Sequence, residues 1–405
     1  MTLAREIPQQ DRLSRPEFVG MIAMLFATVA FSIDSMLPAL PEIAAELTAG
    51  APNRAQLILT SFVLGMGIGT FIAGPLSDRF GRKPVIMGGA LLYCAAALAA
   101  WAAPTLETLL LARVVGGLGA AAPRVVSLAL VRDLYRGREM ARIMSFAMLI
   151  FTLVPAVAPL MGTVIIAGLG WRGIFLSFLA FSAVSMLWLG LRQPETLVPE
   201  ARRDFSAARL WEALREVLSH RVIVTAIGVQ TLVFGALFGT LSSTQQIFDV
   251  TFDRGASFPF WFAVIALMAG TASLVNAALV MRLGMRFLVT VALGGQLVLS
   301  LGMWTMTSQG LWPEALVFPA HVAWTTSVFF MAGLTLGNLN ALAMEPVGHI
   351  AGMAASVIGS VATVLAVALA APLGLAFDGT PLPLMLGVAA FSGVGFLLIR
   401  SLPRA

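Results

Sequence analysis

A short polar segment lies between two long apolar runs at residues 74–84, where the sequence reads GPLSDRFGRKP. Gly74 allows two helix ends to approach closely, Gly81 permits a tight turn, and Pro84 suits the first turn of a following helix. Asp78 at a helix end can accept hydrogen bonds from the N-terminus of a neighbouring helix. The acid, the glycines and their spacing are more than a plain basic turn requires, so this segment predicts a specialised turn between two helices.

The flanking composition is that of a membrane protein. Hydrophobic residues make up 59% of the 405 residues and charged residues only 11%, with a mean hydropathy of +0.92, whereas a soluble domain carries about 25% charged residues. A helix needs about 20 apolar residues to cross the hydrocarbon layer. The length of the chain therefore accommodates twelve spans and their loops.

The apolar runs predict twelve membrane helices and an all-α fold. The first run follows a polar N-terminus without a small-residue cleavage site, so it is expected to be a membrane helix and not a cleaved signal peptide. The predicted helices cover residues 18–40, 55–76, 84–102, 106–131, 143–169, 173–191, 222–247, 258–281, 287–307, 313–342, 347–377 and 381–398.

The chain also divides near its midpoint. The longest polar stretch, residues 192–221, separates a six-helix half at residues 1–191 from a second six-helix half at residues 222–405. The tripeptide Arg-Phe-Gly that ends at Gly81 is matched by Arg-Leu-Gly ending at Gly284, at an offset of half the chain. This internal repeat predicts a duplicated bundle.

Basic residues indicate the orientation. Most of the 25 lie in one alternate set of loops and the termini, and the other set holds only Arg54, Arg172 and Arg254. By the positive-inside rule both termini are expected in the cytoplasm. The net charge of +5 is thus a topology signal, and no nucleic-acid partner is expected. The single cysteine, Cys94, allows no intrachain disulfide and no cysteine-based metal site.

The segment at residues 74–84 resembles the signature of the major facilitator superfamily, G-x-L-x-D-R-x-G-R-K, at every position. The resemblance implies a major facilitator fold and a cytoplasmic latch that holds one conformation. In that family the second arginine pairs with an acid at the end of the fourth helix, for which Asp133 is well placed. The implied latch residues are Gly74, Asp78, Arg79, Gly81, Arg82 and Asp133.

Further segments resemble the drug:proton antiporters of the bicyclomycin-resistance (Bcr/CflA) type. They are DSMLPALP at residues 34–41, VRDLY at 131–135, GWR at 170–172 and QPETL at 193–197, with AMEP at 343–346 in the second half. Two family motifs are incomplete: the fourth-helix motif R-x-x-Q-G lacks its glutamine, and the fifth-helix motif has three glycines replaced. The fifth helix keeps Pro155, Pro159 and Gly162, which favour a kinked, closely packed helix.

Charges inside the predicted spans are candidate functional residues, because a charge at mid-bilayer costs at least about 2.5 kcal/mol. Asp34 and Arg113 lie at similar depths and are expected to form either a structural ion pair or a proton-responsive one. We expect Asp34 to be the proton-coupling carboxylate. Arg124 lies eleven residues after Arg113, on the same helix face, and either lines the cavity or extends toward the interface.

Polar residues of the second half have two interpretations. Gln230, Asn276, His321, Asn338 and Asn340 either bond neighbouring helices or contact a substrate. His321 is the second candidate for proton coupling, because imidazole can change charge near neutral pH. Gln230 is a candidate for the substrate cavity.

The function that the resemblance implies is secondary active export of small amphipathic or drug-like molecules in exchange for protons. Proton-coupled uptake of a small metabolite is the alternative. No nucleophile, phosphate-loop or metal motif supports an enzyme, and no segment resembles a selectivity filter. The expected partners are a small-molecule substrate, protons and the lipid bilayer. The expected protein is a monomer in the bacterial inner membrane, with no cofactor and with the proton gradient as its energy source.

Overall fold

The computed structural model describes residues 13–202 and 206–402. Within these ranges the chain is helical and contains no strand. Twelve of its helical segments are long and apolar enough to cross a membrane. The predicted all-α membrane fold with twelve spanning helices is therefore confirmed for the described residues.

Contacts along the chain divide it into two compact units. The first comprises the chain up to Ala39 and Ser61–Trp211, and the second comprises Leu40–Thr60 and Glu212–Ala405. The spanning helices of the first region are α1 (Arg15–Asp34), α3 (Leu57–Phe80), α4 (Arg82–Trp101), α5 (Leu106–Leu134), α6 (Gly137–Leu169) and α7 (Gly173–Arg192). Those of the second are α9 (Arg221–Gln246), α10 (Phe258–Leu283), α11 (Met285–Ser308), α12 (Glu314–Met344), α13 (Ala351–Leu375) and α14 (Leu382–Arg400).

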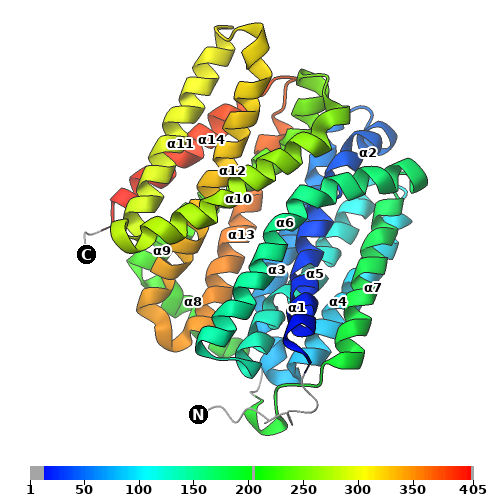
Figure 1. The fold of residues 1–405 in the computed structure, drawn as a ribbon, viewed down its shortest axis with the longest axis vertical. Helices are drawn as coiled ribbons and strands as arrows, with labels where there is room; N and C mark the ends of the chain where they lie inside the picture. The colour runs from blue at the N-terminus through cyan, green and yellow to red at the C-terminus, as the bar shows by residue number, and fades with distance from the viewer. Residues whose placement is uncertain (1–12, 203–205, 403–405) are drawn as a thin grey trace. The chain divides into compact units, whose positions relative to one another are not determined.

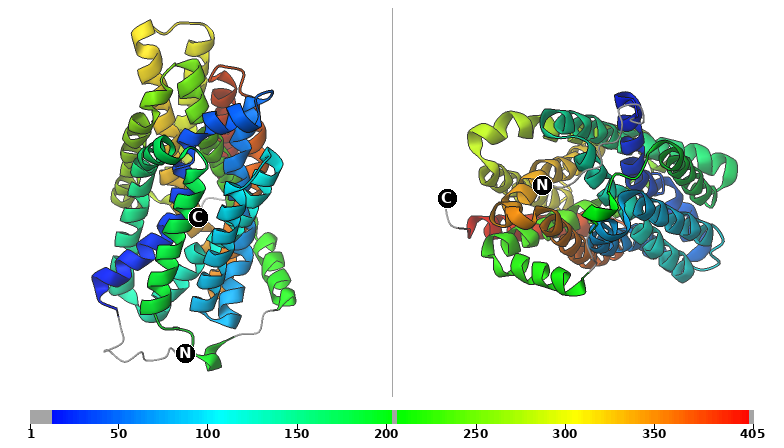
Figure 2. Two further views of the ribbon diagram at one scale, coloured as in Figure 1. Left: turned by 90° about the vertical axis from the view of Figure 1, so that its right-hand side faces the viewer. Right: turned by 90° about the horizontal axis from the view of Figure 1, so that it is seen from below.

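Each unit is a helix bundle, as Figures 1 and 2 show. In the first, α4 packs along α5, α1 along α6, and α4 along α7; in the second, α9 packs along α13 and α14, and α11 along α14. Glycines permit α3 and α5 to cross closely. A side chain at Gly65 would overlap the carbonyl of Val114, and a side chain at Gly117 would overlap the carbonyl of Phe62. Gly65 and Gly117 therefore have a packing role.

The first spanning segment is broken where the sequence predicts a continuous helix to residue 40. Helix α1 ends at Asp34, a short 3-10 turn covers Leu37–Ala39, and α2 (Leu40–Leu47) follows. Pro38 explains the break, because it has no N–H to bond the carbonyl of Asp34 and its ring disfavours helical geometry at the preceding residue. The carboxylate of Asp34 therefore lies at the C-terminal end of a helix.

The predicted polar stretch at residues 192–221 contains a helix that the sequence analysis did not predict. Helix α8 (Ala207–Ser219) lies just before α9. Trp211 and Leu218 are exposed on it, whereas Val217 is buried. Its apolar residues are too few for a membrane span, which is why a search for apolar runs overlooks it.

Candidate functional site

The buried carboxylate predicted in the first helix is present at the α1 break. Asp34 is the last residue of α1 and only 5% exposed. Carboxylates inside membrane spans are rare and often belong to proton or substrate pathways. A carboxylate in this position is a candidate for reversible protonation.

Arg113 on α5 lies beside the same helix end. Its guanidinium is 3% exposed and its Nη2 donates a hydrogen bond of 3.0 Å to the carbonyl of Ser32. Its Cζ also lies 4.3 Å from the ring centroid of Phe62 and 5.7 Å from that of Phe178. A cation near the C-terminus of a helix is stabilised by the partial negative charge of the last carbonyls. Arg113 therefore acts as a cap on the broken helix.

Arg113 thus bonds the backbone of α1 at Ser32, two residues before Asp34, the last residue of the helix. An ion pair that alternates with this cap stays a prediction.

Three aromatic side chains of this region were missed by sequence reasoning. Tyr93 on α4 is buried and its hydroxyl is hydrogen-bonded to the Ser32 hydroxyl. Phe178 on α7 packs edge-on against Phe31 of α1, with ring centroids 5.6 Å apart. Tyr93 could have been found, because it is one of only two tyrosines in the chain and lies inside an apolar run.

One retained residue of the fifth-helix motif, Gly162, meets the same break. Pro155 and Pro159 lie inside α6, and Gly162 faces the backbone of α1, where an added Cβ would come within 2.3 Å of the Ser35 carbonyl oxygen. Thr163 donates to the carbonyl of Pro159 at 3.0 Å. The predicted close packing is confirmed at Gly162, and it occurs next to Asp34.

Arg124 follows Arg113 along the side of α5 that meets α3. Its Nη1 contacts the sulfur of Met66 at 3.6 Å, while Arg113 lies over Phe62, one helical turn earlier on α3. The two arginines therefore share a helix face, as their spacing predicts. Arg124 is half-buried.

Arg82 is the centre of the predicted latch. Its Nε donates to Asp133 Oδ2 at 3.0 Å, and its Nη1 donates to Asp78 Oδ1 at 2.6 Å and Ser77 Oγ at 2.7 Å. The side chain is 10% exposed, against 45% for Asp78 and 22% for Asp133. The expected bond between Arg82 and Asp133 is present, and it links the start of α4 to the end of α5.

A third carboxylate, which the sequence analysis did not single out, completes this turn. Glu195 accepts hydrogen bonds of 3.0 Å from the backbone N–H groups of Arg82 and Lys83. Gly81 has φ of +104°, and a Cβ there would lie 2.5 Å from Glu195 Oε2. Glu195 therefore caps the N-terminus of α4 in a space that only glycine leaves open.

The remaining latch residues have smaller roles. Gly74 accepts a hydrogen bond at its carbonyl from the Ser77 hydroxyl, at 2.8 Å. Arg79 is exposed, with its guanidinium 5.2 Å from the ring centroid of Phe80. Thr196 donates to Asp133 Oδ2 at 3.1 Å, next to the bond from Arg82.

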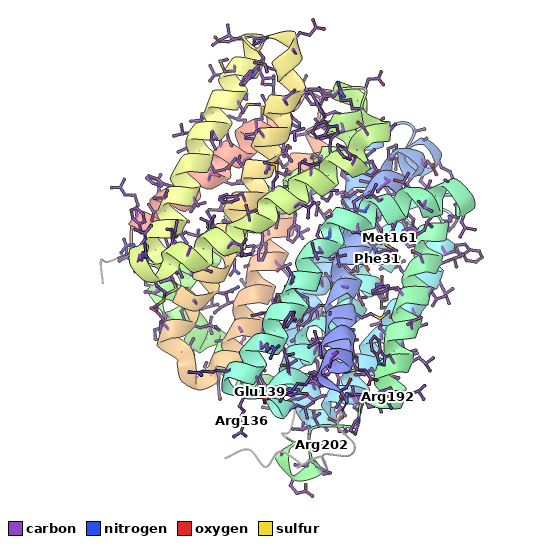
Figure 3. The ribbon with its side chains drawn as sticks, in the orientation of Figure 1. Phe31, Arg136, Glu139, Met161, Arg192 and Arg202 are labelled. Carbon is purple, nitrogen blue, oxygen red and sulfur yellow. The ribbon has the colours of Figure 1, made fainter. Side chains whose placement is uncertain are left out.

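Two ion pairs hold the start of α1 within the first unit. Arg15 bonds Glu139 on α6, and Arg192 at the end of α7 donates to Glu17 at 2.8 Å. Figure 3 shows Glu139 and Arg192 on either side of the lower end of α1. Exposed ion pairs of this kind contribute little to stability, because water screens the two charges.

In the second unit, two of the predicted polar residues, Gln230 and His321, occupy separate places. Gln230 on α9 is 1% exposed and its Nε2 donates to Asn340 Oδ1 at 3.1 Å. His321 on α12 is equally buried, with ring centroids of Phe252 and Trp324 at 5.0 and 5.7 Å. The Gln230 amide and the His321 ring therefore contact different residues. Whether either takes part in coupling stays a prediction.

Known proteins resemble this chain over most of its length. Residues 21–371 match the family model described as Major Facilitator Superfamily. The chain is 30% identical to an uncharacterized MFS-type transporter, YdgK, of Bacillus subtilis, over 86% of each chain. It is 29% identical to a bicyclomycin resistance protein homolog of Haemophilus influenzae, over 85% of each. It is 31% identical to a chloramphenicol resistance protein of Pseudomonas aeruginosa, over 77% of this chain and 80% of that one.

A solved structure shares the fold. The crystal structure of a D-xylose-proton symporter superposes with a TM-score of 0.75, covering 96% of this chain and 98% of the other at 15% identity. Together with the matching family model and the twelve apolar helices, this shows that the protein is a multi-pass membrane protein and that the chain belongs to the major facilitator superfamily of transporters.

Proposed function

We propose that this protein exports small amphipathic or drug-like molecules in exchange for protons. Relatives that cover most of the chain are named for resistance to bicyclomycin and chloramphenicol, and others are named multidrug resistance proteins. The observation that carries the proton-coupled part is Asp34, a carboxylate buried at a helix break inside a spanning segment.

The chemistry of this break suggests how a proton could compete with substrate. When Asp34 is neutral, its burial costs little and Arg113 can remain bonded to the Ser32 carbonyl. When Asp34 loses its proton, the anion needs a partner, and Arg113 is the nearby cation that can leave the carbonyl for it. A change in protonation would therefore alter the cap on α1, and substrate binding could bias the same change.

The network around Arg82 is the proposed latch of the transport cycle. It joins the α3–α4 turn to the end of α5 through Asp133 and to the segment after α7 through Glu195. These bonds involve no residue near Asp34. Variants of this network should therefore change the rate of conformational exchange more than ligand affinity.

We further propose that the protein works as a monomer in the bacterial inner membrane, with both termini in the cytoplasm. The distribution of basic residues supports this orientation. A reporter enzyme that is active only in the periplasm should be silent when fused to the C-terminus and active when inserted after Arg254. A periplasmic signal from the C-terminal fusion would reverse the assignment.

The central test replaces Asp34 by asparagine, which resembles the protonated carboxyl in size. We expect Asp34→Asn to lose at least about 90% of transport driven by a pH gradient, because one tenfold rate change corresponds to only about 1.4 kcal/mol. Uptake of a fluorescent drug into inverted vesicles, with and without a protonophore, measures this. Asp378→Asn is the matched control, because Asp378 lies between α13 and α14 and outside the spanning segments.

A second readout separates coupling from general damage. The parent protein should release protons when substrate is added in detergent, and Asp34→Asn should not, although it keeps measurable binding. Equal proton release from both proteins would make the carboxylate structural and leave His321 as the next candidate. If the proton gradient drives the substrate into cells and not out of them, the uptake alternative is favoured.

A further inference from the structure

The turn into α6 carries a group of exposed cations. Four arginine side chains are exposed within eleven residues, namely Arg132, Arg136, Arg138 and Arg142. Both acids of this stretch are bonded elsewhere, since Asp133 accepts from Arg82 and Glu139 accepts from Arg15. Among the residues that the structure describes, none of the four arginines has an ion-pair partner. Positive charge is therefore in surplus at this turn.

Two of these arginines begin an exposed stripe along α6. Arg142 follows Arg138 by one helical turn, and its Cζ lies 5.9 Å from the ring centroid of Phe146, which is one turn further along. Leu149 and Leu153 continue the same face at spacings of three and four residues, and both are exposed. The helix rises about 16 Å from Arg142 to Leu153, close to half the thickness of the hydrocarbon layer. This α6 stripe therefore passes from charge to apolar surface within one leaflet of a membrane.

The corresponding joint in the second half of the chain provides an internal standard. There the fourth spanning helix, α12, is joined to the fifth, α13, by Glu345–Ile350. Neither this joint nor α13 contains a lysine or an arginine. Both joints fall on the same predicted side of the membrane, so the positive-inside rule alone does not require four arginines at the turn into α6.

The turn leaves room for an anion to approach these arginines. No atom lies within 4 Å of the position that a Cβ on Gly137 would take. Figure 3 shows Arg136 beyond the lower end of α6. Guanidinium groups match phosphate well, because they can donate two parallel N–H bonds to its oxygens. An anionic phosphate group next to apolar chains is the chemistry that the α6 stripe complements.

We propose that the α6 stripe binds an anionic phospholipid. The headgroup phosphate bonds the guanidinium groups of Arg138 and Arg142, and an acyl chain lies along the apolar part of the stripe. Arg132 and Arg136 add attraction for the negative charge. Each arginine close to an anionic headgroup strengthens binding about fivefold. This inference goes beyond the proposed function, because it does not depend on what the protein transports.

The test compares two lipids with the same acyl chains. Native mass spectrometry of the purified full-length protein measures the binding of phosphatidylglycerol, which is anionic, and of phosphatidylcholine, which has no net charge. We expect the parent to prefer phosphatidylglycerol about thirtyfold, since two arginines that bond the phosphate contribute about fivefold each. Arg138→Gln combined with Arg142→Gln should lower this preference to about fivefold or less.

Arg202→Gln combined with Arg282→Gln is the matched control. It removes the same charge from two exposed arginines outside α5 and α6, so the preference should stay near thirtyfold. Phe146→Ala tests the apolar part of the stripe. It should weaken the binding of both lipids alike, because their acyl chains are the same, and leave the preference unchanged.

A headgroup without acyl chains separates a lipid site from a phosphate site. Glycerophosphoglycerol should bind the parent at least about tenfold more weakly than phosphatidylglycerol, because it has no chain to bury against the stripe. Equally tight binding of the two would mean that the turn takes free phosphate groups, and the lipid site would be wrong.

Two further outcomes overturn the proposal. The first is equal binding of phosphatidylglycerol and phosphatidylcholine by the parent, a comparison that needs no variant to fold. The second is a control pair that loses as much preference as the pair at Arg138 and Arg142. Net charge, and not the α6 stripe, would then attract the lipid.

Discussion

The two turns that repeat each other along the chain differ in what surrounds their glycine. Gly81 precedes α4 with φ of +104°, and Gly284 precedes α11 with φ of +82°. At Gly81 an added Cβ would meet Glu195 at 2.5 Å, whereas at Gly284 no atom lies within 4 Å. The backbone turn is therefore shared, but the capping carboxylate belongs to the first turn.

The basic residues of the two turns differ in the same way. Arg82 bonds Asp78 and Asp133, whereas Arg286 donates to the backbone carbonyls of Arg400 and Leu402. The motif therefore has two parts, the glycine of the turn and the acids that bond Arg82. The glycine is a requirement of the helical hairpin in both halves, while the bonds of Arg82 to two acids are what a conformational latch would need.

The largest difference is expected between Arg82→Met and Arg286→Met. The first change leaves two carboxylates beside a partly buried apolar side chain, and removing one partner of a buried pair costs about 3 kcal/mol or more. The second removes bonds to carbonyls near the chain end, worth about 1 kcal/mol each. Arg82→Met should therefore show the lower unfolding midpoint in detergent and lose most transport.

Membrane insertion is measured separately, so that a loss of transport is not confused with a loss of protein from the membrane. Both variants should reach the membrane in amounts similar to the parent, because neither arginine lies in the apolar centre of a span. Equal midpoints and equal transport rates for the two variants would mean that the acids around Arg82 add nothing beyond the turn itself.

A smaller difference is expected between Gly81→Ala and Gly284→Ala. Both positions have backbone angles that are almost restricted to glycine, so each alanine introduces about 1–3 kcal/mol of strain. At Gly81 the new methyl group also displaces Glu195 from the N-terminus of α4, which adds about 1 kcal/mol. Thermal unfolding of the two variants checks the order. An equal loss at both sites would show that Glu195 moves aside freely.

The sequence predicted the parts of the molecule that depend on local patterns. Apolar runs gave the spanning helices, since length and hydropathy are set residue by residue. The pair of Arg82 with Asp133 followed from a motif and from an acid at the end of a predicted helix. The break after Asp34 could also have been predicted, because Pro38 removes the N–H group that would continue the helix.

Other features depend on contacts that no local pattern reveals. Arg113 bonds the backbone carbonyl of Ser32, and backbone acceptors have no signature in the sequence. Its pairing with the carboxylate of Asp34 stays a prediction. Glu195 reaches α4 from a segment more than a hundred residues later. The bond of Gln230 to Asn340 is visible only once both helices are placed.

The smallest effect is expected from Glu195→Gln, which tests the cap on α4 directly. Glutamine keeps the size of the side chain but replaces one acceptor oxygen by an NH2 group. Glu195 accepts from the N–H groups of Arg82, Lys83 and Leu197 at 3.0, 3.0 and 2.9 Å, so the amide must leave at least one of them without an acceptor. The change also removes a negative charge from the N-terminus of α4, where it is favourable. Together these losses should cost about 1–2 kcal/mol and lower the unfolding midpoint by a few degrees, with transport slowed and substrate affinity unchanged.

Glu200→Gln is the matched control, because Glu200 lies in the same segment and is exposed. If the unfolding midpoint of Glu195→Gln equalled that of Glu200→Gln, Glu195 would not stabilise the N-terminus of α4. The turns at Gly81 and Gly284 would then differ in sequence but not in their contribution to the free energy of unfolding.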